Sequence, residues 1–169
     1  VIQSTGAALD YAHTHGIVHR DLKPANMMLL DPEGRIDPTL PLSPETKVVL
    51  TDFGVARLMD ATEISGMIVG TPAYMSPEQS KGRPVDLRAD IYSMGVVLFQ
   101  MLVGEVPYHT PWVKPTRQGN GTARPSSAPV LPNTPETVRA VVSRALTERP
   151  EERYARAGEL ALAFREAVQ

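Results

Sequence analysis

The chain has 169 residues, enough for one domain with a sizeable core, and its 42% hydrophobic and 21% charged content is ordinary for a globular protein. Its formal net charge of −2 lacks the basic excess of nucleic-acid-binding proteins, so we expect no nucleic-acid partner. The absence of cysteine excludes disulfides and thiolate metal sites. No apolar run reaches the roughly 18 residues of a membrane-spanning helix, so we expect no membrane contact from this segment.

The N-terminal half of the chain contains one predicted helix and two predicted strands. Residues 1–15 carry apolar residues at helix-compatible spacing, and Gly16 follows as a helix C-cap. The short apolar runs 27–30 and 47–51 predict two strands. The proline-rich segment 31–46 between them is expected to be an irregular loop, either a solvated insertion or a docking element.

The C-terminal half is predicted to be helical. Residues 90–103 are apolar on nearly every face, which is typical of a helix buried all round. Residues 109–135 are rich in proline and predict a long irregular excursion. Residues 135–147 and 156–168 predict two closing amphipathic helices.

Several short strings occur in an informative order along this framework. Residues 19–26 read H-R-D-L-K-P-A-N and residues 52–54 read D-F-G. Three further strings are G-T-P-A-Y-M-S-P-E at 70–78, D-I-Y-S-M-G at 90–95 and P-E-E-R-Y at 150–154. Together they resemble the C-terminal lobe of the catalytic domain of eukaryotic-like Ser/Thr protein kinases, in particular the bacterial members.

The resemblance implies an α+β fold of the protein-kinase type, with a mostly helical lobe and a short β-hairpin at the metal site. Residues 1–169 then form a partial catalytic domain, with a catalytic loop at 17–26, an activation segment at 52–78 and proline-rich loops at 31–46 and 109–135. The sequence contains no G-x-G-x-x-G loop and no V-A-I-K-like lysine before the catalytic loop. We therefore expect the chain to be a fragment of a longer kinase that lacks the N-terminal lobe.

The resemblance also assigns chemical roles. Asp21 would be the catalytic base for the substrate hydroxyl, and Lys23 would be a cation beside the transferring phosphate and ATP. Asn26 and Asp52 would bind ATP through Mg²⁺, for which Mn²⁺ could substitute, because amide and carboxylate oxygens suit this hard cation. The cofactors implied are thus ATP and Mg²⁺.

The activation segment carries the substrate and regulatory residues that the resemblance implies. Thr71 matches the threonine of the substrate-peptide shelf. Arg20, beside the base, is typical of kinases switched by phosphorylation of the activation segment, because an arginine pairs with the added phosphate. Ser65 and Thr62 are the candidate phosphorylation sites, and Ser65 is slightly favoured.

Five further residues are expected to support the site structurally. His19 and Phe53 match positions that pack in the internal apolar column of the family. Glu78 and Arg153 would form a buried ion pair, and Asp90 would anchor the backbone of the catalytic loop. A zinc site at the three histidines 13, 15 and 19 is an alternative, but spacing alone is its only support.

The implied function of the longer kinase is ATP-dependent transfer of the γ-phosphoryl group to Ser/Thr hydroxyls of protein substrates. This is the reaction of a serine/threonine-protein kinase, a transferase that acts in signal transduction. The isolated chain is expected to be nearly inactive. The alternative is a non-catalytic kinase-like binding or regulatory module. We expect a cytoplasmic location for this segment, while the full-length protein could be anchored in a membrane outside it. The oligomeric state stays open.

Overall fold

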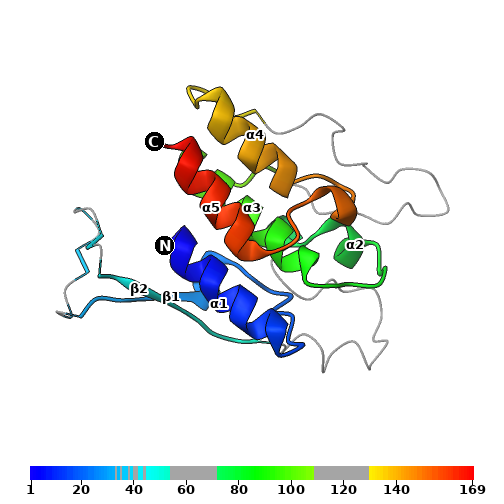
Figure 1. The fold of residues 1–169 in the computed structure, drawn as a ribbon, viewed down its shortest axis with the longest axis horizontal. Coiled ribbons are helices and arrows are strands. Elements are labelled where there is room, and N and C mark those ends of the chain that lie inside the picture. Colours follow the sequence, from blue (N-terminus) through cyan, green and yellow to red (C-terminus); the bar gives the residue numbers. More distant parts are fainter. Residues whose placement is uncertain are drawn as a thin grey trace.

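The computed structural model describes residues 1–32, 34, 36–37, 39, 42–43, 45–53, 72–108 and 130–169. Within these residues the chain forms five α-helices and one antiparallel two-stranded sheet (Figure 1). The helices are α1 (Ile2–Thr14), α2 (Pro77–Ser80), α3 (Arg88–Val103), α4 (Glu136–Ala145) and α5 (Ala157–Ala167), and the strands are β1 (Met27–Leu30) and β2 (Lys47–Leu50). The predicted elements are present with ends within two residues of expectation; the short helix α2 was not predicted.

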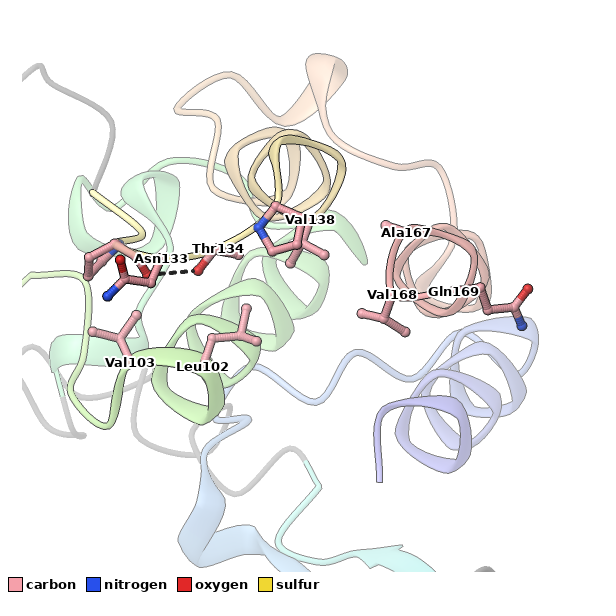
Figure 2. A pocket seen from close by; sticks show the side chains of 10 residues that line it. Leu102, Val103, Asn133, Thr134, Val138, Ala167, Val168 and Gln169 are labelled. Atoms are coloured by element: carbon pink, nitrogen blue, oxygen red, sulfur yellow. Dashed lines mark hydrogen bonds between the residues drawn. The ribbon is translucent and has the colours of Figure 1, made fainter.

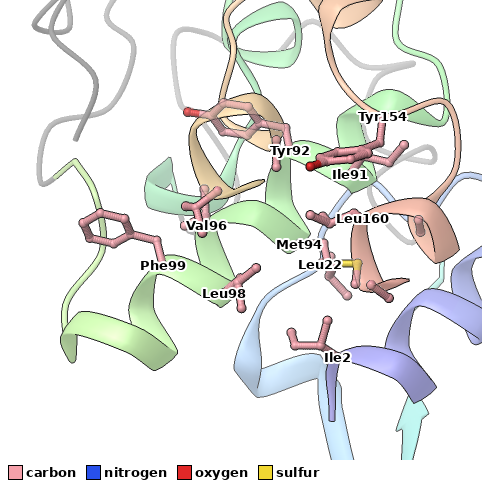
Figure 3. Close-up of a cluster of buried hydrophobic side chains, with 14 of the residues drawn as sticks. Ile2, Leu22, Ile91, Tyr92, Met94, Val96, Leu98, Phe99, Tyr154 and Leu160 are labelled. Atoms are coloured by element: carbon pink, nitrogen blue, oxygen red, sulfur yellow. The ribbon is translucent and has the colours of Figure 1, made fainter. Parts of the chain in front are cut away.

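Helix α3 forms the centre of the helical body. Every residue from 89 to 99 is buried, and their side chains pack with those of α1, α5 and the loop residue Leu22 (Figure 3). The prediction of burial on all faces fails for the last turn, where Met101 and Leu102 are 54% and 39% exposed. Leu102 lines an open pocket beside α4 and α5, so packed side chains do not cover this turn completely. Gly104, with φ of 87°, then ends the helix in the left-handed conformation that glycine adopts without strain.

Helix α3 and helix α4 approach closely at a glycine. A Cβ atom added to Gly95 would lie 2.8 Å from the Cβ atom of Ala145. Two small residues therefore set the distance between the two helices, because any larger side chain at either position would separate the backbones.

Helices α1 and α5, the first and last of the chain, lie side by side (Figure 1). Asp10 of α1 accepts hydrogen bonds from the backbone N–H groups of Ala157 and Gly158, at 2.9 and 3.1 Å. Asp10 thereby satisfies two of the N–H groups that a helix N-terminus leaves without intrahelical partners. This contact joins the two ends of the described chain.

The hairpin β1–β2 pairs Met27 with Leu50 and Met28 with Val49. On one face Val48 and Leu50 are buried against the helical body, whereas Met28 and Val49 on the other face are 52% and 41% exposed. One face of the hairpin is therefore apolar and open. Among the described residues, no helix has the length and apolar character needed to cross a membrane.

Candidate active site

The predicted catalytic loop leaves the end of α1 and reaches β1 through a short 3₁₀ turn at Pro24–Asn26. The fully buried Asp90, in the first turn of α3, binds the backbone of this loop from below. Its carboxylate accepts the N–H group of His19 at 2.8 Å and the N–H group of Arg20 at 2.7 Å. Hydrogen bonds to an ionised acceptor are the stronger kind, so the loop is fixed to the most buried helix of the lobe.

A third group reaches the same carboxylate. The Nε2 atom of His13, at the end of α1, lies 2.8 Å from Oδ2 of Asp90, and both side chains are nearly fully buried. His13 was considered above only as a zinc ligand. Its ring nitrogen is instead directed at Asp90, and the described part of the chain contains no group of three histidine or carboxylate side chains arranged to hold a metal ion.

Asp21, the predicted base, lies at the mouth of the loop with one third of its side chain exposed. The ammonium group of Lys23 lies 2.7 Å from Oδ2 of Asp21. The amide nitrogen of Asn26 donates to the Asp21 carbonyl at 2.8 Å and to Oδ2 at 3.2 Å. The structure thus brings three of the sequence-predicted residues into one cluster, in which a cation and an amide orient a carboxylate that solvent can still reach.

Asp52 lies two residues after the end of β2. The N–H group of Thr51, directly before it, donates to the carbonyl of Asn26 at 3.0 Å, so the end of β2 is tied to the start of β1. Asp52 itself is exposed and has φ of 60°, a left-handed conformation that is uncommon outside glycine. Because Asn26 uses its amide nitrogen on Asp21, its amide oxygen points away from that residue and is oriented to act as an acceptor.

The two residues expected to pack do make contact. The rings of His19 and Phe53 have their centroids 4.6 Å apart and are tilted by 46°. His19 is fully buried, while Phe53 is 37% exposed. The N–H group of Asp21 donates to Nδ1 of His19 at 3.3 Å, so a neutral ring carries its proton on Nε2, which is buried without a partner among the described residues.

Glu78 and Arg153 form a buried bidentate ion pair. Nη1 and Nη2 of Arg153 lie 2.7 and 2.8 Å from the two carboxylate oxygens of Glu78. The remaining donors of the guanidinium bind the carbonyl oxygens of Arg88, Thr147 and Glu148 at 2.9–3.0 Å. The pair therefore joins α2, the start of α3 and the turn before α5.

Three of the predicted site residues cannot be placed. Thr71, Ser65 and Thr62 lie outside the described residues, as does most of the segment 52–78. Most of the predicted proline-rich loop 109–135 also lies outside them.

One contact to the loop is not indicated by the sequence. The amide nitrogen of Gln79, in α2, donates to the carbonyl oxygen of Arg20 at 2.7 Å. The string Ser76-Pro-Glu-Gln79 has the spacing of a helix capping box, so its local role was readable from sequence. The contact across 59 positions to Arg20 was not, because nothing local indicates it.

A cavity of about 750 Å³ lies at the other end of α3. Leu102 and Val103 line one side of it, Val138 of α4 lines another, and Ala167 and Val168 line a third (Figure 2). None of the sequence-predicted site residues lines this cavity. It is separated from Asp90 by most of the length of α3, so it is distinct from the cluster around Asp21.

The comparison with known families and proteins agrees with this geometry. The family model described as the protein kinase domain matches residues 1–164. Serine/threonine-protein kinase Pkn1 of Myxococcus xanthus is 41% identical over 174 residues, which cover 100% of this chain and 23% of that protein. Serine/threonine-protein kinase PknB of Mycolicibacterium smegmatis is 37% identical over 166 residues, which cover 95% of this chain and 24% of that protein. The chain thus spans about a quarter of the length of these relatives.

A solved structure shows the same architecture. The crystal structure of the Mycobacterium tuberculosis PknI kinase domain matches with a TM-score of 0.64 at 28% identity, and the match covers 98% of this chain and 53% of that one. The predictions of a bacterial-type Ser/Thr kinase resemblance and of a kinase-like α+β fold are confirmed by these matches. The chain therefore belongs to the protein kinase domain family.

Proposed function

We propose that this chain is the C-terminal lobe of an ATP-dependent protein kinase that transfers the γ-phosphoryl group to Ser and Thr hydroxyls of protein substrates. The observation that carries the proposal is the cluster of Asp21, Lys23 and Asn26, in which a partly exposed carboxylate is oriented by a cation and an amide. The anchoring of its loop to the buried Asp90 supports it, since phosphoryl transfer depends chiefly on positioning.

In this reaction ATP supplies the phosphoryl group and Mg²⁺ neutralises the charge that develops on it. Asn26 and Asp52 would hold the metal, because an amide oxygen and an exposed carboxylate at the end of adjacent strands are ligands that Mg²⁺ accepts. Mn²⁺ has similar preferences and could replace it. The donor chemistry of the residues present therefore fits the group.

Asp21 accepts the proton of the substrate hydroxyl and directs its oxygen at the phosphorus atom, while the bond from phosphorus to the bridging oxygen of ADP breaks. Lys23 remains beside Asp21 as a compact positive charge that attracts the phosphate oxygens. Thr71 would hold the substrate peptide. Phosphorylation of Ser65 or Thr62 would pair with Arg20 and order the activation segment.

We also propose that the glycine-rich loop and the strand lysine, which bind the ATP phosphates in a kinase, are absent from these 169 positions. The support is that the sequence has no glycine-rich loop or strand lysine and covers 53% of the matched kinase domain. The N-terminal lobe that carries these residues would pack on the exposed apolar face of the hairpin, which includes Met28 and Val49. For this kinase we also propose a cytoplasmic location and protein substrates.

The test is phosphotransfer by the full-length gene product, wild type against Asp21→Asn, with ATP, Mg²⁺ and a peptide library carrying Ser and Thr acceptors. General-base assistance is worth about 10²–10⁴-fold, so Asp21→Asn should lower kcat by at least about 100-fold with an unchanged unfolding temperature. Residues 1–169 alone should transfer phosphate hardly at all. A wild-type protein that is inactive while its substrate affinity persists would instead favour the binding module.

A further inference from the structure

Arg20, the residue directly before Asp21, has a backbone conformation that is held from both sides. Its φ of 66° is left-handed, which L-residues adopt rarely and keep only where surrounding contacts impose it. Its N–H group donates to Oδ1 of Asp90 at 2.7 Å, and its carbonyl oxygen accepts the amide nitrogen of Gln79 at 2.7 Å. The two contacts come from α3 and α2, so the conformation depends on both helices.

The contact with Gln79 acts on the peptide unit that carries Asp21. The carbonyl of Arg20 and the N–H group of Asp21 belong to one rigid plane, which also contains the Cα atom of Asp21. Gln79 holds this plane at its oxygen, and Nδ1 of His19 accepts its N–H group at 3.3 Å. These two contacts fix the peptide plane that precedes Asp21, while Lys23 and Asn26 contact its carboxylate directly.

The amide of Gln79 can occupy only one orientation. Its oxygen accepts the backbone N–H group of Ser76 at 3.0 Å and the hydroxyl of Ser76 at 2.9 Å. A rotated amide would place a donor against that N–H group and an acceptor against the Arg20 carbonyl. Ser76, the cap residue of α2, is fully buried. Hydrogen bonds therefore run without a break from Ser76 through the amide of Gln79 to the peptide plane before Asp21.

We propose that Gln79 is a positioning residue for Asp21, which acts by holding the peptide plane between Arg20 and Asp21 from α2. The inference rests on the proposed function, because Asp21 is the base only in that reaction. With α2 docked, the Arg20 carbonyl is bound and the carboxylate of Asp21 points at the acceptor hydroxyl. When Gln79 is replaced by a residue that cannot donate, the Arg20 carbonyl loses this hydrogen bond, and the orientation of Asp21 is held less firmly.

Two variants of Gln79 separate this role from helix capping. Gln79→Glu keeps the oxygen that accepts from Ser76, and glutamate suits this position of a capping box, but it replaces the donor to Arg20 with an acceptor. Gln79→Met removes both contacts. Gln3→Met is the matched control, because Gln3 also donates its amide to a backbone carbonyl of another helix, that of Ala161 at 2.5 Å, away from the loop.

The full-length gene product and these variants would be compared by steady-state kinetics and by amide hydrogen exchange of the peptide covering residues 19–26. Misplacement of a catalytic group by about 1 Å costs up to about 100-fold, so both Gln79 variants should lose about 10–100-fold in kcat with KM for ATP changed by less than about two-fold. Exchange in residues 19–26 should rise in both. Gln3→Met should match wild type in both measurements.

A purely capping role predicts that Gln79→Glu behaves as wild type, and that result would overturn the inference. So would unchanged exchange in residues 19–26 in both Gln79 variants, whether or not the protein has kinase activity. A wild-type protein that transfers no phosphate would contradict the proposed function but not this contact. Faster exchange in the Gln79 variants would then still show that the hydrogen bond from Gln79 orders the loop.

Discussion

Arg153 provides the sharpest test of how this lobe is held together. Its side chain is fully buried, and its five N–H donors have five acceptors: both oxygens of Glu78 and three backbone carbonyls. Its guanidinium carbon also lies 4.9 Å from the centre of the Tyr92 ring. Arg153→Met removes every one of these interactions and leaves the carboxylate of Glu78, which is 6% exposed, without a counter-charge.

Breaking a buried pair from one side costs about 3–5 kcal/mol, because the remaining charge is not compensated. Arg153→Met should therefore lower the free energy of unfolding of the kinase domain by about 3–5 kcal/mol, and its unfolding temperature with it. Arg153→Lys should recover only part of this loss, because an ammonium group has three donors and cannot match both oxygens of Glu78 in one plane. Scanning calorimetry of the full-length protein would measure both effects.

The control for charge alone is Arg139→Met, which removes an exposed ion pair with Glu136 on α4. Exposed pairs contribute at most about 1 kcal/mol, so this variant should unfold within a few degrees of wild type. The double variant Glu78→Gln with Arg153→Met should cost less than the sum of the single variants, because it removes both charges together. Additive losses, or a loss in Arg153→Met no larger than in Arg139→Met, would refute this account of the pair.

Two further perturbations test the packing and the pH dependence. Gly95→Ala should lower the free energy of unfolding by about 1–3 kcal/mol in urea, because the added Cβ would lie 2.8 Å from the Cβ atom of Ala145. The double variant with Ala145→Gly should recover part of this loss. A Gly95→Ala variant as stable as wild type would contradict the close approach of the two helices. Burial raises the pKa of the Tyr154 hydroxyl above its ordinary value of 10.0, against the opposing effect of Arg144. The folded state therefore holds the hydroxyl proton more tightly than the unfolded state. The contribution of this proton to the free energy of unfolding is complete below pH 10 and is lost as the pH rises through 10 and above. Tyr154→Phe should make the fall in unfolding temperature between about pH 9 and 11 shallower, and an identical fall in both proteins would count against the shift.

Much of the fold was predictable because its signals are local. Helix α3 was readable from an apolar run too continuous for a surface helix, and the hairpin from two short apolar runs. The family and the identities of the candidate site residues came from short strings, in which Asp21, Lys23 and Asn26 lie within six positions of one another. Side chains so close along a loop meet whenever that loop folds back once, as it does at the turn Pro24–Asn26.

The contacts that orient these residues were decided by tertiary structure. Asp90 reaches the loop across 70 positions, Gln79 reaches Arg20 across 59, and Asp10 caps α5 across 147. The exposure of Met101 and Leu102 also depended on how the neighbouring helices pack, which the apolar pattern of α3 does not contain. The chemistry of the site is carried by residue types that sequence displays directly. Its geometry depends on hydrogen bonds between segments that only the packed core brings together, because the same side chain makes different contacts wherever the fold places it.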